Sequence, residues 1–482
     1  MSVRDGSSLQ RGARYMSVVI VGGGPVGLVT SIVLSSHGVA NTIIERDATV
    51  YGLPRAIVMD AEIRHSLSRL GLADALDLVL QPMVAADFVD AAGKTLMGID
   101  LAGVELLGCP AVSKHFQPRL DAALRAAAIS RGARLILGRV ASSFALGSDA
   151  VRVTLDDGTV VEADYLVGCD GASSVIRKSL GIALQDLGFD QDWLVVDLLL
   201  RDRATSGLPD VTRQVCDARR PTTLVSGFGD YYRFEFQLQP GEDPKAMCED
   251  RSLWSLLRPW TGPEKASIVR KAAYRFHAVV AESMNQGRVL LAGDSAHQMP
   301  PFMGQGLNSG MRDAFNLGWK LAYLRKGLSS ARLLDTYSSE RIPGVRTTVV
   351  QSVETGRLID QLAGRSSHGV SESAGYGGSR RRVGYENGVV AGSSEHRGTI
   401  YSQWHRFTDY DTGSFLVLLA IDSSVDGDSL SEWRIPHDVR RVDRDLTYGA
   451  DVVFVRPDGY VAAVCSAAEC NGTLRTLNSA MR

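Results

Sequence analysis

The sequence has little of what marks an oxidised, membrane-spanning or strongly charged protein. Its six cysteines form no CxxC pair and show no metal-site spacing, which predicts reduced thiols and no bound metal. The 52 basic and 54 acidic residues nearly cancel, so no charge excess points to nucleic acid or to an anionic membrane. Runs of about 20 apolar residues, long enough to cross a bilayer, are lacking. A cytoplasmic protein is expected.

The chain length is sufficient for two or three domains with a large buried core, since it holds 482 residues. Residues 1–15 are polar and charged, without the apolar centre of a secretory signal. We expect them to form a disordered extension before the first strand.

A strand, a glycine-rich turn and a helix are predicted near the N-terminus. The apolar residues 17–21 predict the strand, and residues 28–36 predict the helix. The intervening turn has GxGxxG spacing and includes a proline: Gly22, Gly24, Pro25 and Gly27. Such glycines allow a tight turn, close approach of a pyrophosphate and packing of helix on strand.

An acidic residue follows at the distance expected for a dinucleotide site. A second strand over residues 41–44 ends at Glu45, 18 residues beyond Gly27, and Arg46 comes next. A carboxylate there accepts hydrogen bonds from a ribose diol. Together with the turn, Glu45 predicts an adenine dinucleotide site, and these residues leave FAD and NAD(P) open.

The segment from Arg288 to Leu324 contains a second loop suited to an anion. Residues 289–292 predict a buried strand that ends at Asp294, and a helical stripe is expected from Leu307. The loop between them is rich in proline and glycine, with Pro300, Pro301, Gly304, Gln305 and Gly306. The helix N-terminus presents unpaired N–H groups and a positive dipole end, so it attracts negative charge.

Three further polar residues follow predicted strands or begin helices. Arg55 lies in a loop and is either a phosphate ligand or a solvated arginine. Gln117 starts a helix with Pro118 in its first turn. Asp170 ends an apolar strand, where an acid either contacts a cofactor or caps the next helix.

Residues 186–280 predict a different kind of layer. Strands are expected over residues 193–200, 222–227 and 231–238, and the last alternates aromatic with polar side chains. This pattern predicts a half-buried antiparallel sheet with an aromatic face. Trp193, Tyr232 and Phe234 are candidates for a substrate pocket, although a plain packing surface explains the same alternation.

Several motifs recur in one order. They are Gly22–Gly27 with Glu45, then Leu166–Gly171, then Gly293–Pro301, joined by Pro54–Ala56, Phe116–Pro118, Trp193–Asp197, Gly304–Gly306, Arg312-Asp313 and Arg456–Tyr460. The set resembles the FAD-dependent aromatic hydroxylases of the para-hydroxybenzoate hydroxylase class. It is most similar to the 3-(3-hydroxyphenyl)propionate hydroxylase branch, with aromatic polyketide hydroxylases as near relatives.

The resemblance implies an α/β fold in three parts. A Rossmann-like FAD-binding domain is expected over residues 16–75, 111–185 and 281–355. An interleaved, mostly antiparallel substrate domain is expected over residues 76–110 and 186–280. Residues 356–482 are expected to form a small thioredoxin-like domain without redox cysteines, after a Ser/Gly-rich linker near 366–379.

It also implies residue roles. Gly22, Gly24 and Gly27 would hold the FAD pyrophosphate, and Glu45 the adenosine ribose. Arg55 and Gln117 would contact phosphate and ribityl groups, Asp170 both FAD and NAD(P)H, and Asp294 the ribityl chain. The loop from Pro300 to Leu307, continued by Asn308, would lie along the isoalloxazine. His297 is expected to be structural.

The implied activity is NAD(P)H-dependent hydroxylation of a phenolic or other electron-rich aromatic ring. NADH or NADPH binds transiently and reduces FAD, O₂ adds as a flavin C4a-hydroperoxide, and one oxygen atom passes to the ring. Epoxidation, Baeyer–Villiger oxygenation and a reductase without oxygen insertion remain alternatives. No residue is predicted as a base, and a homodimer is possible.

Overall fold

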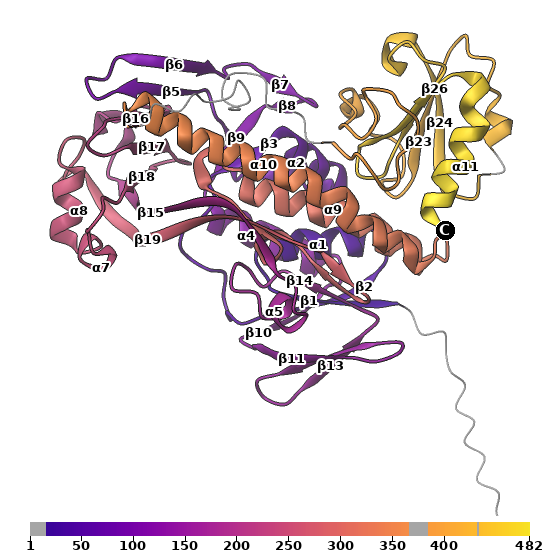
Figure 1. The fold of residues 1–482 in the computed structure, drawn as a ribbon, viewed down its shortest axis with the longest axis horizontal. Helices are drawn as coiled ribbons and strands as arrows, with labels where there is room; N and C mark the ends of the chain where they lie inside the picture. The colour runs from indigo at the N-terminus through magenta and orange to yellow at the C-terminus, as the bar shows by residue number, and fades with distance from the viewer. Residues whose placement is uncertain (1–15, 366–383, 431–432) are drawn as a thin grey trace, which may run out of the picture.

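The computed structural model describes residues 16–365, 384–430 and 433–482. Two sheets form the main body, with two long helices between them and a third, smaller sheet at one end (Figure 1). The predicted extension at residues 1–15 and linker near 366–379 lie outside the described residues.

The first sheet has six strands and is parallel except at one edge. Its strands, in spatial order, are β10 (Arg134–Leu137), β2 (Ala40–Glu45), β1 (Ser17–Val21), β14 (Tyr165–Gly168), β21 (Val289–Leu291) and the antiparallel β20 (Asn285–Gln286). The central strands are wholly or almost wholly buried, as expected of a parallel sheet covered on both faces.

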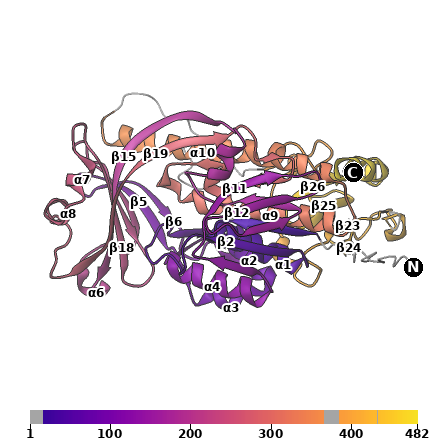
Figure 2. The ribbon, with the colours of Figure 1, turned by 90° about the horizontal axis from the view of Figure 1, so that it is seen from below.

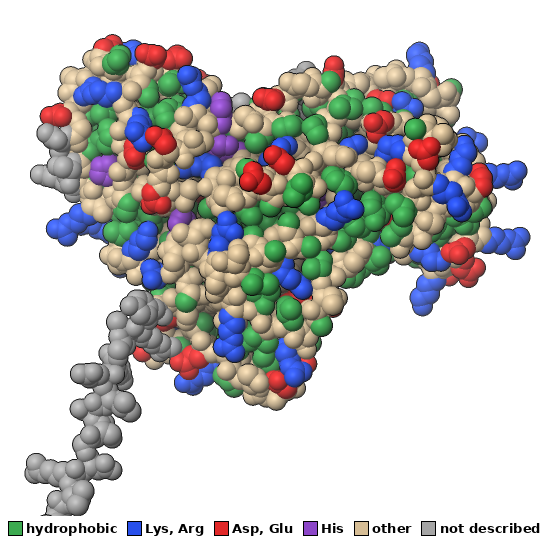
Figure 3. Space-filling view, turned by 180° about the vertical axis from the view of Figure 1, so that it is seen from behind, with side chains coloured by type: hydrophobic (Ala, Val, Ile, Leu, Met, Phe, Trp, Pro, Cys, Tyr) green, Lys and Arg blue, Asp and Glu red, His purple; other side chains and the backbone are tan. Residues whose placement is uncertain are grey.

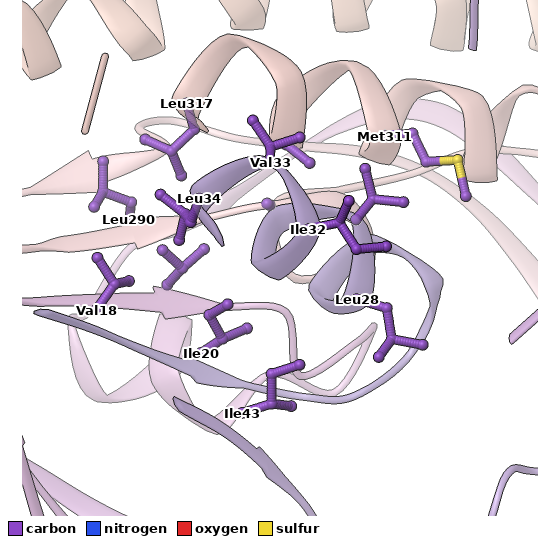
Figure 4. Packing of buried hydrophobic residues seen from close by; sticks show 14 of the residues in the cluster. Val18, Ile20, Leu28, Ile32, Val33, Leu34, Ile43, Leu290, Met311 and Leu317 are labelled. Carbon is purple, nitrogen blue, oxygen red and sulfur yellow. The ribbon is translucent and has the colours of Figure 1, made fainter. Parts of the chain in front are cut away.

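Helices α1 (Pro25–Ser36), α4 (Gln117–Ser130) and α9 (Gln305–Arg325) pack over this sheet. A three-stranded antiparallel sheet contributes to the same core from below (Figure 1). Its strands are β11 (Ala141–Leu146), β12 (Val151–Leu155) and β13 (Val160–Ala163). Figure 4 shows Ile32 and Val33 of α1 between the sheet and Leu317 of α9. This core fixes the glycine-rich turn and the start of α9 in one rigid frame.

The second sheet has eight strands and is mostly antiparallel (Figure 2). In spatial order they are β22 (His297–Gln298), β19 (Ala266–Ala281), β15 (Leu184–Leu200), β18 (Tyr231–Gln237), β17 (Thr222–Ser226), β16 (Thr212–Cys216), β5 (Ala85–Asp90) and β6 (Thr95–Asp100). Beside it lie α6 (Arg203–Ser206), α7 (Pro244–Met247) and α8 (Asp250–Leu257).

Short elements connect the two sheets. They comprise two small sheets and two helices: β3 (Val58–Asp60), β4 (Leu80–Pro82) and β9 (Val112–His115), then β7 (Glu105–Leu106) and β8 (Cys109–Pro110), with α2 (Ala61–Leu67) and α3 (Ala73–Asp77). A further helix, α5 (Val175–Ser179), follows β14.

The C-terminal region has its own mixed sheet. Its order is β24 (His437–Val442), β23 (Phe415–Ala420), β25 (Val452–Val455) and β26 (Val461–Cys465), followed by α11 (Cys470–Met481). The β23–β24 pair is parallel and the other pairs are antiparallel. The predicted class, a Rossmann-like domain with an antiparallel sheet domain and a small thioredoxin-like one, is confirmed.

Some predicted boundaries differ from the observed ones. Helix α1 begins at Pro25 and not at residue 28, because proline suits the first helical turn. Helix α9 begins at Gln305, two residues before the predicted start, after the left-handed Gly304. Helix α10 (Asp335–Leu362) continues through position 355, where the FAD-binding part was expected to end.

The surface carries mixed charge. On the face shown in Figure 3, basic and acidic side chains are interspersed and no large patch has a single sign. None of the helices in the described ranges has the length and apolarity needed to cross a bilayer.

Candidate functional site

A large cavity lies where the two main sheets meet. Its volume is about 1560 Å³, above the roughly 300–1000 Å³ typical of a site for one small ligand. One end is lined by the glycine-rich turn after β1, and the other by polar residues of the eight-stranded sheet. The cavity therefore has room for a dinucleotide and a second molecule together.

The turn after β1 shows why three glycines are needed. Gly22 has φ of +107°, and a side chain there would overlap the Cys169 carbonyl. A side chain at Gly27 would overlap the Gly22 carbonyl, so Gly27 packs the helix on the strand. Gly24 has no atom near its missing side chain and lines the cavity, as do Gly22 and Pro25. A pyrophosphate could approach the backbone at Gly24.

Glu45 lies at the end of β2 beside this turn. One carboxylate oxygen accepts a hydrogen bond from the Gly23 N–H at 2.5 Å, and the other accepts from the Asp47 N–H at 2.8 Å. Glu45 and the adjacent Arg46 both line the cavity. The carboxylate is thus held in place by the loop, with lone pairs left for a ribose.

Gln117 and Arg55 lie on neighbouring parts of the wall. Gln117 accepts a hydrogen bond from the Ala56 N–H at 2.7 Å and donates one to Asp121 at 3.2 Å, so it fixes the loop that carries Arg55. The Arg55 guanidinium stacks on the Tyr51 ring, 4.5 Å from its centroid, and is exposed to the cavity. The arginine is therefore placed at the wall, and none of the acids in the described ranges forms an ion pair with it.

Asp170 has the capping role that the sequence left as an alternative. Its oxygens accept hydrogen bonds from the Ser174 hydroxyl at 2.6 Å and from the Ile176 N–H at 3.0 Å. It also lines the cavity, so the structure allows contact with a ligand in addition to the cap.

Asp294 ends the segment after β21 and points into the cavity. It lies deep in the molecule, yet its side chain is exposed, because the neighbouring space is cavity and not protein. No residue in the described part of the chain donates a hydrogen bond to its carboxylate. The acid is therefore free to accept bonds from ligand hydroxyls.

The loop before α9 is more ordered than predicted. Residues Pro301–Met303 form one turn of 3-10 helix, and Gly304 has φ of +64° against Val58. Pro301, Gly304, Gly306 and Leu307 line the cavity, whereas Pro300 does not. The first-turn N–H groups of α9 have no acceptor within the helix, so they are available to an anionic ring edge.

Two loop residues act within the protein. Asn308 is fully buried, accepts a hydrogen bond from the Asp60 N–H at 2.9 Å and donates to the Gly304 carbonyl at 2.9 Å. Gln305 donates to Asp60 at 3.3 Å and accepts from Arg312 at 3.2 Å, although it borders the cavity. Asn308 does not line the cavity, so its predicted cofactor contact is replaced by a positioning role.

A buried ion cluster holds the Asp294 segment from behind. Asp313 lies 2.7 Å from His297 Nε2, accepts a hydrogen bond from Arg341 Nε at 2.7 Å and another from the Gly293 N–H at 2.9 Å. Burial alone raises the pKa of Asp313, but Arg341 and His297 lower it below its usual value. His297 is structural, as expected.

The three residues predicted for the substrate pocket do not line the cavity. Tyr232 and Phe234 lie on the opposite face of β18, in a core cluster with Leu253 and Leu257 of α8. Trp193 shares the cavity side but sits behind Phe302, with ring centroids 5.2 Å apart. The aromatic face is the packing surface, which corrects the expected assignment.

The polar face of β18 is enclosed, and the prediction of a half-buried sheet is wrong. Arg233, Glu235 and Gln237 are all buried, because this face looks into the molecule and not toward solvent. Arg233 bonds Asp197 through Nε at 2.7 Å, and Arg270 bonds the same carboxylate at 3.2 Å. Arg233 also donates to the Arg55 carbonyl at 2.6 Å, which ties the sheet to the dinucleotide end.

Three contributors to the site were not predicted as site residues. Arg312 and Asp313 belong to one of the recurring motifs, but the sequence predicted no role for them. The residues with which they form ion pairs lie far away in the sequence, so no local pattern indicates these pairs. Asp121 borders the cavity, and burial raises its pKa to about 6. Its position one turn after Gln117 on α4 was a usable signal.

These groups fit a flavin dinucleotide. Gly24 leaves space for a pyrophosphate, Glu45 and Asp294 present acceptors to sugar or ribityl hydroxyls, and the α9 N-terminus faces the same cavity. In the described ranges, no three His, Cys, Asp or Glu side chains are grouped as a metal site.

The chain is similar in sequence to known hydroxylases. It is 35% identical over 353 residues to a probable NADH-specific resorcinol 4-hydroxylase of Rhodococcus jostii, covering 72% of this chain and 66% of that one. It is 35% identical over 351 residues to a 3-(3-hydroxy-phenyl)propionate/3-hydroxycinnamic acid hydroxylase of Mycolicibacterium smegmatis, covering 71% and 61%. The match thus spans just under two thirds of these relatives' lengths.

Solved structures share the fold. Aklavinone-11 hydroxylase in complex with FAD and aklavinone has a TM-score of 0.83 at 23% identity, with 96% of this chain and 99% of that chain covered. RebC with bound 7-carboxy-K252c has a TM-score of 0.80 at 22% identity over the same shares. The family model described as FAD binding domain matches residues 15–352, most of the chain. With the dinucleotide turn, Asp294 and the α9 loop around one cavity, this protein belongs to the FAD binding domain family.

Proposed function

We propose that the protein is an FAD-dependent, NAD(P)H-consuming monooxygenase that hydroxylates a phenolic or other electron-rich aromatic ring. The observation that carries the proposal is the continuous cavity, which joins the dinucleotide end to the enclosed polar face of β18. FAD supplies the redox chemistry, taking electrons from the nicotinamide and activating O₂ for insertion of one oxygen atom. The two sequence relatives, both named as hydroxylases of phenols, support the same reaction.

The chain's own residues bind, orient and exclude water. Gly24 and the α9 N-terminus receive the charged parts of the cofactor, and Asp294 accepts bonds from its hydroxyls. Phe302 and Met303 on the cavity wall contribute apolar surface, which keeps water from the reacting ring. NADH is the proposed reductant, because one relative is described as NADH-specific.

Cytoplasmic location and a homodimer stay predictions. All six cysteines are free, which agrees with a reducing compartment. Sedimentation of the purified protein will report its oligomeric state.

The decisive experiment is a panel of phenols and polycyclic aromatics. The holoenzyme should consume NADH faster when a substrate is present, and the product mass should rise by one oxygen atom. Rapid NADH consumption without any oxygenated product would favour the reductase alternative, and the product's structure separates ring hydroxylation from epoxidation or Baeyer–Villiger insertion.

Asp294→Ala should weaken FAD binding at least about tenfold, because a hydrogen bond to a charged group contributes about 1.5–3 kcal/mol. Flavin absorbance per mole of purified protein measures the effect. Asp149→Ala, in the exposed turn between β11 and β12, is the matched control and should retain FAD. Full flavin content in the Asp294 variant would contradict its role.

A further inference from the structure

Glu235 is a buried acid that forms an ion pair with Arg233 but accepts no hydrogen bond from the residues the structure describes. Its residue is 6% exposed, and it borders the cavity from the centre of β18. The Arg233 guanidinium is 3.7 Å from its Oε1, beyond hydrogen-bond distance. Within the described ranges no group donates a hydrogen bond to this carboxylate. A buried acceptor left open in a cavity points to a ligand donor.

The other acids of the cavity are occupied or lie at the cofactor end. Asp87 on the cavity wall is held by two nitrogens of Arg213, and Asp197, which is not on the wall, accepts from both Arg233 and Arg270. The remaining acids on the wall are bonded to backbone, arginine or glutamine, or belong to the dinucleotide end: Glu45, Asp47, Asp60, Glu62, Asp100, Asp121, Asp170 and Asp294. Glu235 is the open acid on the sheet wall.

The charged groups around Glu235 carry a net charge of +1, which one anion neutralises. The groups facing it are Arg233 and Gln237 on β18, Asp197 and Val195 on β15, Arg270 and Tyr274 on β19, Thr223 on β17 and Gln214 on β16. Two arginines and Asp197 leave one positive charge in excess. Either an ionised Glu235 or one other anion therefore neutralises the cluster, but two anions together do not.

We propose that Glu235 accepts the hydrogen bond of the substrate's phenolic hydroxyl and takes its proton during turnover. The inference rests on the proposed function and names its base. The phenol O–H bond breaks, an O–H bond forms on the Glu235 carboxylate, and the electron pair stays on the phenolate oxygen, where it activates the ring carbons. When the hydroxylated carbon has lost its own proton to water, Glu235 returns the proton to that oxygen.

The arginines make this exchange favourable. Before transfer the single negative charge is on Glu235, and afterwards it is on the phenolate, so the cluster stays neutral throughout. Burial raises the pKa of Glu235, and the raised value brings the acid closer to the pKa of a phenol. A proton can then be shared between the two oxygens.

Turnover of resorcinol by the holoenzyme tests the proposal. Glu235→Gln should lower kcat about 100-fold at neutral pH, because the proton acceptor is lost, and the rate should recover as pH rises toward the apparent pKa of the bound phenol. Wild-type kcat should fall on the acid side as Glu235 takes up a proton. Glu235→Asp, which keeps a carboxylate, should restore part of the rate and the acid limb, and the exposed Glu264→Gln should behave as wild type.

Binding of 4-nitrophenol gives a readout without turnover, because its phenolate has an absorption band that the neutral phenol lacks. Wild-type protein should bind the neutral form. Glu235→Gln leaves one positive charge of the Arg233, Arg270 and Asp197 group uncompensated, so the apparent pKa of the bound phenol should fall by about one unit or more.

Two different outcomes distinguish a failure of the proposed function from a failure of the role of Glu235. A wild-type holoenzyme that oxygenates no phenol would contradict the proposed function. A wild type that hydroxylates resorcinol, paired with a flavin-loaded Glu235→Gln of unchanged kcat, pH profile and nitrophenol spectrum, would overturn the role of Glu235 alone.

Discussion

Glu340 and Glu235 are both buried beside arginines, yet their oxygens are used in opposite ways. Glu340 on α10 accepts hydrogen bonds from Lys320 and Arg456 at 2.8 Å each, and from Asn316 at 2.7 Å and the Val389 N–H at 2.8 Å. Glu235 accepts none from the described residues.

The location of each acid explains the difference. Glu340 joins α9 and α10 to the C-terminal sheet, whose Arg456 and Asp458 complete the cluster (Figure 1). Every oxygen there is needed to hold three separate elements together. Glu235 faces a cavity with space for a ligand. A buried acid whose oxygens all accept hydrogen bonds from the protein thus indicates a structural role, whereas a buried acid with unused oxygens beside a cavity indicates ligand binding.

The largest effect should come from breaking the saturated cluster. Glu340→Gln keeps the shape but leaves Lys320 and Arg456 with only Asp458 as counter-charge. Removing one partner of a buried ion pair costs about 3–5 kcal/mol. Urea unfolding followed by circular dichroism should show this loss, with Glu264→Gln unchanged. A loss below about 1 kcal/mol would mean that the cluster does not hold the domains together.

Acid titration should sharpen the comparison with a smaller effect. Burial alone raises the pKa of Glu340, but Arg456 and Lys320 hold it at about 2, below its model-compound value of 4.5. A depressed carboxyl pKa gives stability that is present above pH 4.5 and lost as pH falls through about 2.

The difference between a pKa of 4.5 and one of about 2 corresponds to at most about 3.4 kcal/mol. The difference in unfolding free energy between wild type and Glu340→Gln should therefore shrink as pH falls through that window. A difference that stays constant with pH would show that the charge of Glu340 is not the source of its contribution.

The two clusters also show what the sequence could predict. The turn at Gly22, the acid at Glu45 and the acid at Asp294 were found because each follows a strand within a local pattern. Glu340 could not be found in this way, since it meets Arg456, 116 positions away in the sequence. No spacing rule relates residues brought together only by the packing of α10 on the C-terminal sheet.

Strand β18 shows a different limit. Alternation correctly separated Tyr232 and Phe234 from Arg233 and Glu235, because successive side chains point to opposite faces. It could not show what covers each face. The pattern alone predicts a pocket on the aromatic face and solvent on the charged face, whereas α8 covers the aromatic face and the cavity adjoins the charged one.

The smallest expected effect on stability comes from Glu235→Gln. Whether this substitution raises or lowers the stability is more informative than the size of the change. The pKa of Glu235 is higher in the folded state than in the unfolded state, so protonation of this carboxyl stabilises the folded state. This stabilisation is fully present below about pH 4.5 and is lost as pH rises through the folded-state pKa. At neutral pH ionised Glu235 is therefore a cost, and Glu235→Gln should leave the urea midpoint unchanged or raise it. The same substitution type at Glu340 lowers it, although both acids are buried beside arginines. A marked fall at Glu235 would make it a structural partner of Arg233, and the functional meaning of an open carboxylate would be lost.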